Sequence, residues 1–349
     1  GENRAPFFSL LFVPPAVAAE WRVKMFNKNQ IISYSLVIVF VAISFLGHPF
    51  VLAKESAKEV IKNELKIKLE ESKKHLEDPA ELIDVTFVDI ENGYSYNEKE
   101  GLKKIDIYKV KNGKVTFKDG SVIPVNNDCG QFFTMTSNNS ELKNSSQSTY
   151  SEFRRVRSYS GYRKTEGYIT LPSSSDISGV NASGEAAYNY MGIGGTINVE
   201  QGLVMGGLYG GVWRVYHNIS GNWVDDKWPT NGIPAGTKVF LREYVPQDNQ
   251  IALYISYSGG SKTFIYTAQG AKYDGTNQDM RRVTSLLLNG NGYSKKNIWS
   301  NVYIANKSEM HLWGTADTKV GKDYTEKTTY VTTTNVDPYY NETINIDCP

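Results

Sequence analysis

Residues 184–228 decide the fold, and they contain the stretches GEAAYNYMGIGG (184–195), TINVEQGLVMGG (196–207) and GVWRVYHNISGNWVDDKW (211–228). Glycines separate runs in which apolar and polar side chains alternate. Because successive side chains of a β-strand point to opposite faces, this alternation is typical of half-buried strands. The segment therefore predicts three strands joined by glycine turns.

The middle run, residues 196–205, has one face suited to a core and one suited to water or a ligand. Its apolar face is formed by Ile197, Val199, Leu203 and Met205. Its polar face is formed by Thr196, Asn198 and Glu200. A sheet with one apolar face must bury that face against a second layer, and no helical pattern lies nearby to provide it. These residues predict two sheets packed face to face, a β-sandwich.

Short strands with the same alternation continue along the chain and are separated by short turns. They are expected at residues 167–171, 238–245, 251–257, 262–268, 283–288, 299–305 and 324–333. With no helical spacers between them, about ten such strands favour an antiparallel, all-β fold over an α/β fold. The sandwich domain is expected at residues 152–349.

The beginning of the chain has the pattern of an export signal. Residues 1–24 show no periodicity, and we interpret them as a translated leader outside the natural protein. Residues 25–53 combine a basic start, an apolar run at 31–46 and the small-residue cleavage site VLA at 51–53. The apolar run is shorter than the roughly 20 residues that a membrane span requires. We therefore expect a signal peptide, a secreted protein and no stable membrane anchor after cleavage.

Residues 54–130 predict an amphipathic helix followed by a small β-meander. The helix is expected at 54–78, before Pro79. The residues on its apolar stripe are Ile61, Leu65, Leu69 and Leu76. Short alternating runs from 85 to 125 contain Asn-Gly and Asp-Gly turn signals, which indicate hairpins. Residues 131–151 are rich in serine and asparagine and are expected to be a linker.

Charge and cysteine content limit the classes of partner and compartment. The formal net charge is +1, so no strong electrostatic field favours nucleic acid as a partner. The two cysteines, Cys129 and Cys348, bracket the expected sandwich. In an oxidising compartment we expect them to form a disulfide, with two separate thiols as the alternative.

Several motifs, in this order, resemble the sandwich of the glutamic peptidase (eqolisin) family. They are SYSGY at 158–162, EGYITLP at 166–172, YMGIGG at 190–195, VEQG at 199–202 and VWRVYH at 212–217. The resemblance implies a concanavalin-like double sheet, or jelly roll. It puts Glu200 where the family has its catalytic Gln and Val215 where it has its catalytic Glu, so it does not imply peptidase activity. The whole chain also resembles the YrpD-like group of secreted Gram-positive proteins, whose function is undefined.

The preferred function is binding of extracellular or cell-wall polysaccharide by the concave face of the sandwich. Asn198 and Glu200 are expected to contact sugar hydroxyls. Trp213, Tyr216 and Trp223 are the candidate aromatic platform, because aromatic faces stack on sugar rings. Alternation puts Trp213 and Tyr216 on opposite faces of one strand, so only one of them can belong to this platform.

A catalytic function on the same scaffold is the first alternative. Glu185 and Glu200 lie on adjacent expected strands and are the only attractive pair of carboxylates. A polysaccharide lyase or glycosidase would use them as acid and base if they lay about 5–9 Å apart. His217 lies at a strand end and is interpreted as a surface imidazole.

The second alternative is a self-associating matrix protein, which the 23 tyrosines would suit. No cofactor is expected. Asp274, Asn277 and Asp279 form an oxygen-rich pattern that calcium would accept, with an ordinary Asp/Gly turn as the competing interpretation.

Overall fold

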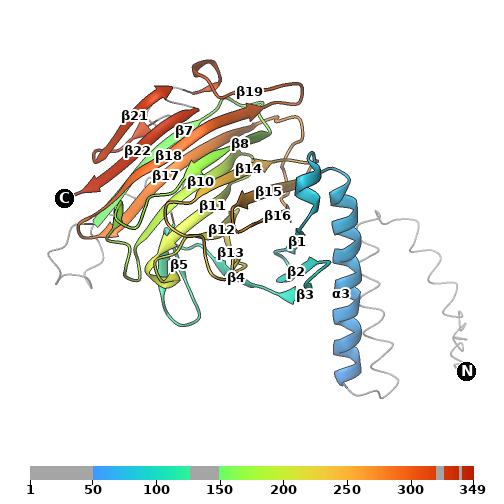
Figure 1. Ribbon diagram of the computed structural model, residues 1–349. Coiled ribbons are helices and arrows are strands. Elements are labelled where there is room, and N and C mark those ends of the chain that lie inside the picture. Colours follow the sequence, from blue (N-terminus) through green and yellow to red (C-terminus); the bar gives the residue numbers. More distant parts are fainter. Residues whose placement is uncertain (1–49, 126–148, 320–325, 338–339) are drawn as a thin grey trace, which may run out of the picture. The chain divides into compact units, whose positions relative to one another are not determined.

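The structure, a computed structural model, describes residues 50–125, 149–319, 326–337 and 340–349 (Figure 1). The chain divides into two compact units, residues 1–61 and 62–349. In the first unit, the described residues form the beginning of helix α3 (Phe50–Lys73). The end of α3 and all of the described strands belong to the second unit.

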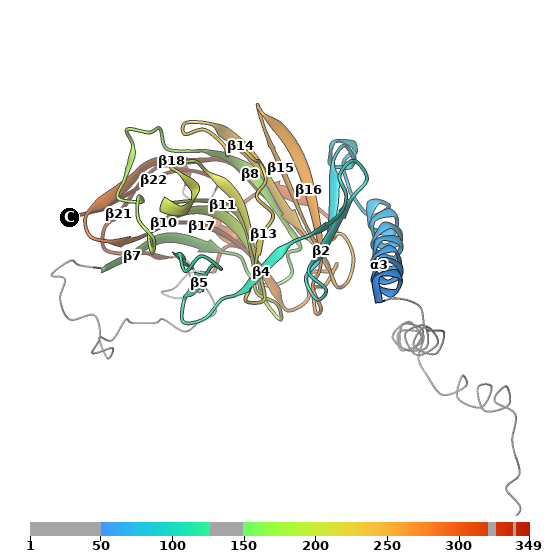
Figure 2. The same cartoon turned by 90° about the horizontal axis from the view of Figure 1, so that it is seen from below.

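The described strands of the second unit form two large sheets in two layers (Figure 2). The twelve-stranded sheet has the order β21 (Val331–Asp337), β22 (Asn341–Cys348), β18 (Gly292–Ala305), β8 (Lys164–Thr170), β14 (Lys238–Tyr244), β15 (Gln250–Tyr257), β16 (Gly260–Thr267), β1 (Val85–Asp89), β2 (Tyr94–Asn97) and β3 (Gly101–Lys104), with β9 (Ile177–Ser178) and β19 (Met310–Leu312) also paired to β18. The eight-stranded sheet has the order β20 (Glu326–Lys327), β7 (Thr149–Arg157), β17 (Gln278–Asn289), β10 (Ala186–Gly195), β11 (Val199–Gly206), β12 (Arg214–Ile219), β13 (Asn222–Asp225) and β4 (Asp106–Lys109). Neighbouring strands in these described parts are antiparallel except for the parallel pair β1 and β16. The predicted all-β sandwich is confirmed.

Apolar side chains from both layers form one core between the sheets. Leu241 of β14 and Leu253 of β15 belong to the same buried cluster as Met191 of β10 and Val215 of β12. The predicted apolar face of residues 196–205, which include most of β11, also lies in this cluster and comprises Ile197, Val199, Leu203 and Met205. Alternation along the strands therefore identified the core-facing side chains correctly.

A second apolar cluster lies on the opposite face of the eight-stranded sheet. A separate hairpin, β5 (Lys114–Thr116) and β6 (Val122–Pro124), packs there (Figure 2). Val115 and Ile123 of this hairpin are fully buried against Tyr188, Tyr190 and Val204 of the sheet. Because a two-stranded hairpin is at best marginally stable alone, it must bury its apolar side chains against another element.

The predicted boundary between a small module at 54–130 and the sandwich is wrong. Strand β1 pairs with β16, and β2 and β3 extend the same sheet. Strand β4 pairs with β13 and extends the other sheet. Without these partners, β13 and β16 would be edge strands with unpaired backbone groups. The early strands therefore complete both layers of the sandwich.

Helix α3 ends at Lys73, earlier than the predicted residue 78. Leu65 and Leu69 of the predicted stripe are buried. A 3₁₀ turn, η2 (Pro79–Leu82), then begins with a capping box, in which the Asp78 carboxylate accepts from the Ala80 amide. Asp78 and the proline that follows it stop the preceding helix and start this turn.

Several predictions fall partly or wholly outside the described residues. The leader at 1–24, most of the signal peptide at 25–53 and most of the linker at 131–151 are among them. Cys348 is a free, buried thiol, whereas Cys129 lies outside the described residues, so the structure gives no support to the predicted disulfide. Among the helices of the described ranges, none combines the length and the apolar character that crossing a membrane requires.

Candidate functional site

The structure brings four of the predicted ligand-binding residues to one face of the eight-stranded sheet. Glu200 of β11 is directly opposite Asn218 of β12, and Asn218 is opposite Trp223 of β13. Tyr216 and Asn198 point to the same face. Trp213 lies on the other side, fully buried in the core between the sheets, so its assignment to this platform is wrong. The reason is the strand alternation that separates it from Tyr216.

This face is covered, so its aromatic residues do not form an open platform for sugars. Tyr216 and Trp223 are each 1% exposed and stack with their ring centroids 4.9 Å apart. Tyr188 packs edge-on against Tyr216 and donates a hydrogen bond to the Pro124 carbonyl of β6. The aromatic side chains thus supply the apolar surface on which β5 and β6 pack, which is the function of a core.

A row of charged and polar side chains crosses the same face. Asp279 accepts hydrogen bonds from Arg157 and Arg281, at 2.7 Å from Arg157 Nη2 and 3.2 Å from Arg281 Nε. Arg281 also donates to Asn198 Oδ1 at 3.0 Å. Glu200 is buried and accepts from Asn218 Nδ2 at 2.9 Å. Glu200 therefore belongs to a structured polar row, whereas Arg214 donates hydrogen bonds to the carbonyls of residues 227 and 229.

The calcium pattern in this region is accounted for by other interactions. Asp279 binds two guanidinium groups, and Asp274 Oδ1 accepts from the Thr276 amide in a turn. Asn277 has a left-handed backbone with φ of 57°, as is common for asparagine in turns. In the described part of the chain, no group of three or more His, Cys, Asp or Glu side chains is arranged to hold a metal ion.

Gly194 makes room for the polar row, which gives a first prediction. A Cβ atom at position 194 would lie 1.9 Å from Arg281 Nη2. We expect Gly194→Ala to displace this guanidinium and to lower the free energy of unfolding by about 1–3 kcal/mol, the usual range for overpacking. Urea unfolding of Gly194→Ala, Arg281→Ala and the double variant would measure it. The double variant should lose less stability than the sum of the losses in the two single variants. Additive losses would show that the clash lies elsewhere.

The proposed acid–base pair is not assembled. Glu200 is opposite Gly192 in the ladder of β10 and β11, whereas Glu185 immediately precedes Ala186, which is opposite Gly206. At about 3.3 Å per residue, the offset of seven positions from 185 to 192 separates the two glutamates by roughly 23 Å along the sheet. Glu185 instead accepts from the amides of Asn181 and Ala182 and caps its own turn. The Glu185/Glu200 hypothesis is therefore wrong in geometry, because a glycosidase pair lies within about 10 Å.

An open groove lies on the outer face of the twelve-stranded sheet. Its volume is about 780 Å³, and it crosses β8, β14, β15 and β18. Tyr168 and Phe240 form its aromatic floor with ring centroids 5.1 Å apart, and Tyr254 continues the row at 6.1 Å from Phe240. Tyr168 is 36% exposed, whereas Tyr254 is largely buried. This groove combines accessible aromatic surface with polar groups, as carbohydrate and small-molecule sites do.

A network of ion pairs holds the aromatic floor in place. Arg242 lies over Phe240 and Tyr254, with its guanidinium carbon 5.4 Å and 5.9 Å from the ring centroids. It donates to Glu166 Oε2 at 2.6 Å and to Glu81 Oε1 at 2.7 Å. Glu81 is fully buried and also accepts from the Tyr244 hydroxyl. Because its partners fix Arg242, the aromatic rings that it contacts are preorganised.

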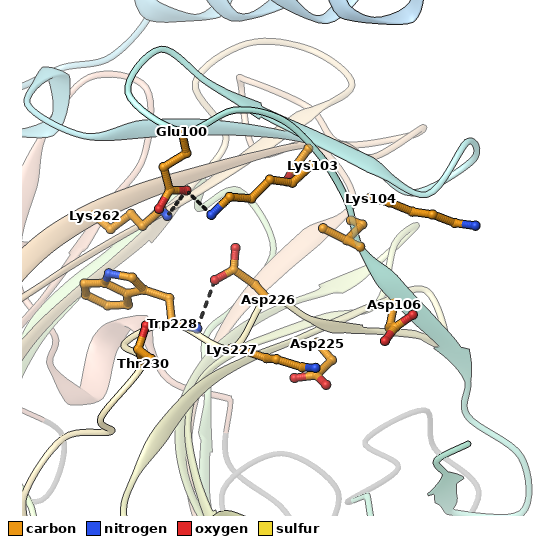
Figure 3. Close-up of a pocket in the computed structure, with 12 residues that line it drawn as sticks. Glu100, Lys103, Lys104, Asp106, Asp225, Asp226, Lys227, Trp228, Thr230 and Lys262 are labelled. Carbon is orange, nitrogen blue, oxygen red and sulfur yellow. Dashed lines mark hydrogen bonds and ion pairs between the residues drawn. The ribbon is translucent and has the colours of Figure 1, made fainter. Parts of the chain in front are cut away.

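A second hollow, of about 370 Å³, lies where the chain crosses from β3 to β4 and so from one sheet to the other (Figure 3). Asp226 and Trp228, which follow β13, form one wall. Glu100, Lys103 and Lys262 form the opposite wall. This pocket differs from the groove because charged side chains rather than aromatic rings dominate it.

Sequence reasoning missed the groove although its strands were predicted. Tyr168, Phe240 and Tyr254 each occupy an outward position between two core-facing residues, for example Phe240 between Val239 and Leu241. Alternation alone gives that orientation. The missing information was that β8, β14 and β15 are neighbours, which joins residues more than 70 positions apart.

Comparisons with known proteins found solved structures with weak similarity to this chain. No protein-family model and no curated protein matches the chain. A structure of scytalido-glutamic peptidase with a transition-state-analogue inhibitor matches with 10% identity and a TM-score of 0.40 over 58% of this chain and 100% of that chain. A second, with a peptide-based analogue, has 8% identity and a TM-score of 0.35 over 57% and 100%. SCP-B, an eqolisin family member bound to a tripeptide, has 9% identity and a TM-score of 0.35 over 58% and 100%.

Proposed function

We propose that this chain is an exported protein that binds extracellular or cell-wall glycan in the groove of the twelve-stranded sheet, without catalysing a reaction on it. The observation that carries the proposal is the row of aromatic rings in an open groove, with Tyr168 accessible at its surface. Aromatic faces contribute large, rigid contact area at low cost in conformational entropy, and they pack against the apolar faces of sugar rings.

Polar side chains around the rings support recognition of hydroxyl groups. Ser256 and Asn301 line the groove and offer both donors and acceptors. Lys238 lies over the Tyr168 ring, with its ammonium nitrogen 4.3 Å from the centroid, and is exposed. A glycan can therefore gain hydrogen bonds at the rim of the groove while its rings contact the floor.

The surroundings of the two carboxylates that line the groove, Glu166 and Asp78, support binding rather than hydrolysis. Glu166 accepts a hydrogen bond from Arg242 Nε at 2.6 Å and lies 3.5 Å from Lys164 Nζ, so two cations hold its carboxylate in place. The Ala80 amide and Arg242 lower the pKa of Asp78. Groups held in this way accept hydrogen bonds from sugar hydroxyls, whereas a general acid must carry a proton near the working pH.

Export remains part of the proposal and is supported by the sequence pattern at residues 25–53. The near-neutral net charge is consistent with a partner that is neither nucleic acid nor a strongly charged surface.

A glycan-binding assay with groove variants tests the proposal. Purified protein would be incubated with insoluble cell-wall peptidoglycan and with a panel of soluble polysaccharides, and affinity and reducing-sugar release would be measured. We expect Tyr168→Ala to weaken binding about five- to tenfold, because the ring loses a contact worth about 1 kcal/mol, while Tyr168→Phe keeps most of it. We expect no release of reducing sugar.

Tyr159→Ala is the matched control, because Tyr159 is 50% exposed and does not line the groove. Equal losses for Tyr159→Ala and Tyr168→Ala, or no binding to any glycan, would reject the proposal. Release of reducing sugar would identify an enzyme instead.

Self-association is a second candidate for the same face. Tyr168, Ile298, Met310 and Leu312 are all exposed and lie on β8, β18 and β19. Clustered exposed apolar side chains often mark a protein interface. Sedimentation of the wild type as a dimer that Tyr168→Ala converts to a monomer, without glycan binding, would favour this candidate.

A further inference from the structure

The pocket at the crossing from β3 to β4 has walls of opposite charge (Figure 3). On one wall, Asp225 and Asp226 line the cavity. Asp226 Oδ1 accepts from the Trp228 amide at 3.1 Å. Within the described part of the chain, neither carboxylate has a lysine or arginine nitrogen within the 4.0 Å of an ion pair. Burial raises the pKa of both groups, so a cation arriving in the pocket would stabilise their charged forms.

The other wall carries excess positive charge. Lys262 is only 3% exposed and lies 3.4 Å from Glu100 Oε2. The same oxygen lies 3.2 Å from Lys103 Nζ, so one carboxylate is shared by two ammonium groups. Lys103 is exposed and its ammonium faces the hollow (Figure 3). This wall therefore has one positive charge more than its anions neutralise.

The backbone between the acidic residues and Trp228 is held in an unfavourable conformation. Lys227 has φ of 64°, in the left-handed region, which costs a non-glycine residue roughly 1–2 kcal/mol. The turn at Lys227 lets Asp225, Asp226 and Trp228 all line the same cavity. Strained residues of this kind gather at ligand sites, where they orient the contacting side chains.

We propose that this pocket binds a small zwitterion of the α-amino-acid class, with its ammonium group at Asp226 and its carboxylate at Lys103. The half-buried Trp228 ring offers an apolar surface for the side chain of the ligand and a favourable face for its ammonium group. A neutral sugar would form no ion pair with either wall, and a simple anion or cation would form an ion pair with only one of them. A volume of about 370 Å³ falls within the range of small-molecule sites. This inference does not depend on glycan binding in the groove.

Calorimetric titration of the full chain with L-leucine, N-acetyl-L-leucine and L-leucinamide tests the proposal. The two derivatives have the same side chain and lack the free ammonium and the free carboxylate, respectively. We expect L-leucine to bind and each derivative to bind at least tenfold more weakly. Undetectable binding of L-leucine, or equal affinity for N-acetyl-L-leucine, would overturn the proposal.

Variants of the two walls complete this test. Asp226→Asn and Lys103→Gln should each reduce the affinity for L-leucine at least tenfold. Because Lys103 is exposed, Lys103→Gln should fold normally, and its loss of affinity would report on the pocket itself. Lys99→Gln is the matched control, because Lys99 is an exposed lysine of the turn before β3 and does not line the pocket. Wild-type affinity in both Asp226→Asn and Lys103→Gln would contradict the assignment of the two walls.

Discussion

Replacing Glu342 with alanine is expected to lower the free energy of unfolding by about 3–5 kcal/mol, the range measured when one partner of a buried ion pair is removed. Glu342 on β22 is 2% exposed and binds two guanidinium groups. Arg154 Nε lies 2.8 Å from its Oε1, and Arg282 donates to its Oε2. Arg282 is itself 1% exposed and stacks on Trp299. Removal of the carboxylate would leave two buried cations without this compensating charge.

Denaturant unfolding at constant pH measures this loss, with the slope of the transition checked for a change in the denatured state. Asp347→Ala is the matched control, because Asp347 lies on the same strand and pairs with Lys295 at 2.7 Å while remaining 61% exposed. An exposed pair contributes about 0–1 kcal/mol. Glu342→Gln keeps the size of the side chain and one acceptor oxygen but loses the charge and the second acceptor, so its loss of stability should fall between those of Glu342→Ala and Asp347→Ala. A loss below about 1 kcal/mol in Glu342→Ala would mean that the guanidiniums find other partners.

Strand alternation was enough to predict the architecture and the inner faces of the strands. It placed Leu203 and Met205 in the core and separated Trp213 from Tyr216, as the structure confirms. Each of these inferences uses only neighbours in sequence, for which the two-residue period is a strict geometric rule. Alternation also puts His217 on the core face, where it is fully buried, so the interpretation of His217 as a surface imidazole at a strand end is wrong.

Burial of His217 follows from the facing sheet, which sequence does not reveal. Its ring lies 4.6 Å from Phe264 and 5.0 Å from Tyr266, and Gln201 bonds to its Nδ1 at 2.8 Å. Desolvation lowers the pKa of His217 to about 3, so it is neutral in the folded protein. A polar side chain on the core face can be accommodated only when another strand supplies a partner, and the identity of that strand is a property of the topology.

The candidate sites were less predictable than the fold for the same reason. Trp223 was assigned to a ligand face, yet the early strand β4 pairs with β13 and the hairpin of β5 and β6 covers the cluster to which Trp223 belongs. The groove and the charged pocket both combine strands that are distant in the chain, as in the pairing of β1 with β16. Alternation gives the direction of a side chain, whereas a site also requires knowledge of which strands are neighbours and which faces are covered.

Glu243→Gln is expected to stabilise the protein at neutral pH. Glu243 of β14 is fully buried, and neither of its carboxyl oxygens has a hydrogen-bond partner among the described residues. Burial, with a further contribution from the nearby Glu200, raises the pKa of Glu243 well above its usual value of 4.5, although Arg281 opposes this shift. The folded protein therefore keeps a proton on Glu243 at pH values where the unfolded chain has released it.

This difference in proton binding sets the direction of the pH dependence. Below about pH 4.5 both states carry the proton, and Glu243 makes no pH-dependent contribution. As the pH rises from there towards the folded-state pKa, the folded protein loses about 1.4 kcal/mol of stability per pH unit through this residue. Glutamine cannot titrate, so Glu243→Gln should match the wild type near pH 4 and exceed it by about 1–2 kcal/mol near pH 6.

Unfolding of the wild type and of Glu243→Gln across pH 4–8 tests this prediction, because all other titrating groups are common to both proteins and cancel in the difference. Glu309→Gln provides the control, because Glu309 is exposed. The difference in free energy of unfolding between Glu309→Gln and the wild type should not change with pH. A difference for Glu243→Gln that does not change with pH would show that the Glu243 carboxyl titrates alike in both states. If the difference in free energy of unfolding between Glu243→Gln and the wild type grows with pH, the core of the sandwich holds a protonated carboxylic acid at the expense of stability. The ionisation state of such a glutamate is then set by its enclosure between the two sheets, which the sequence alone does not reveal.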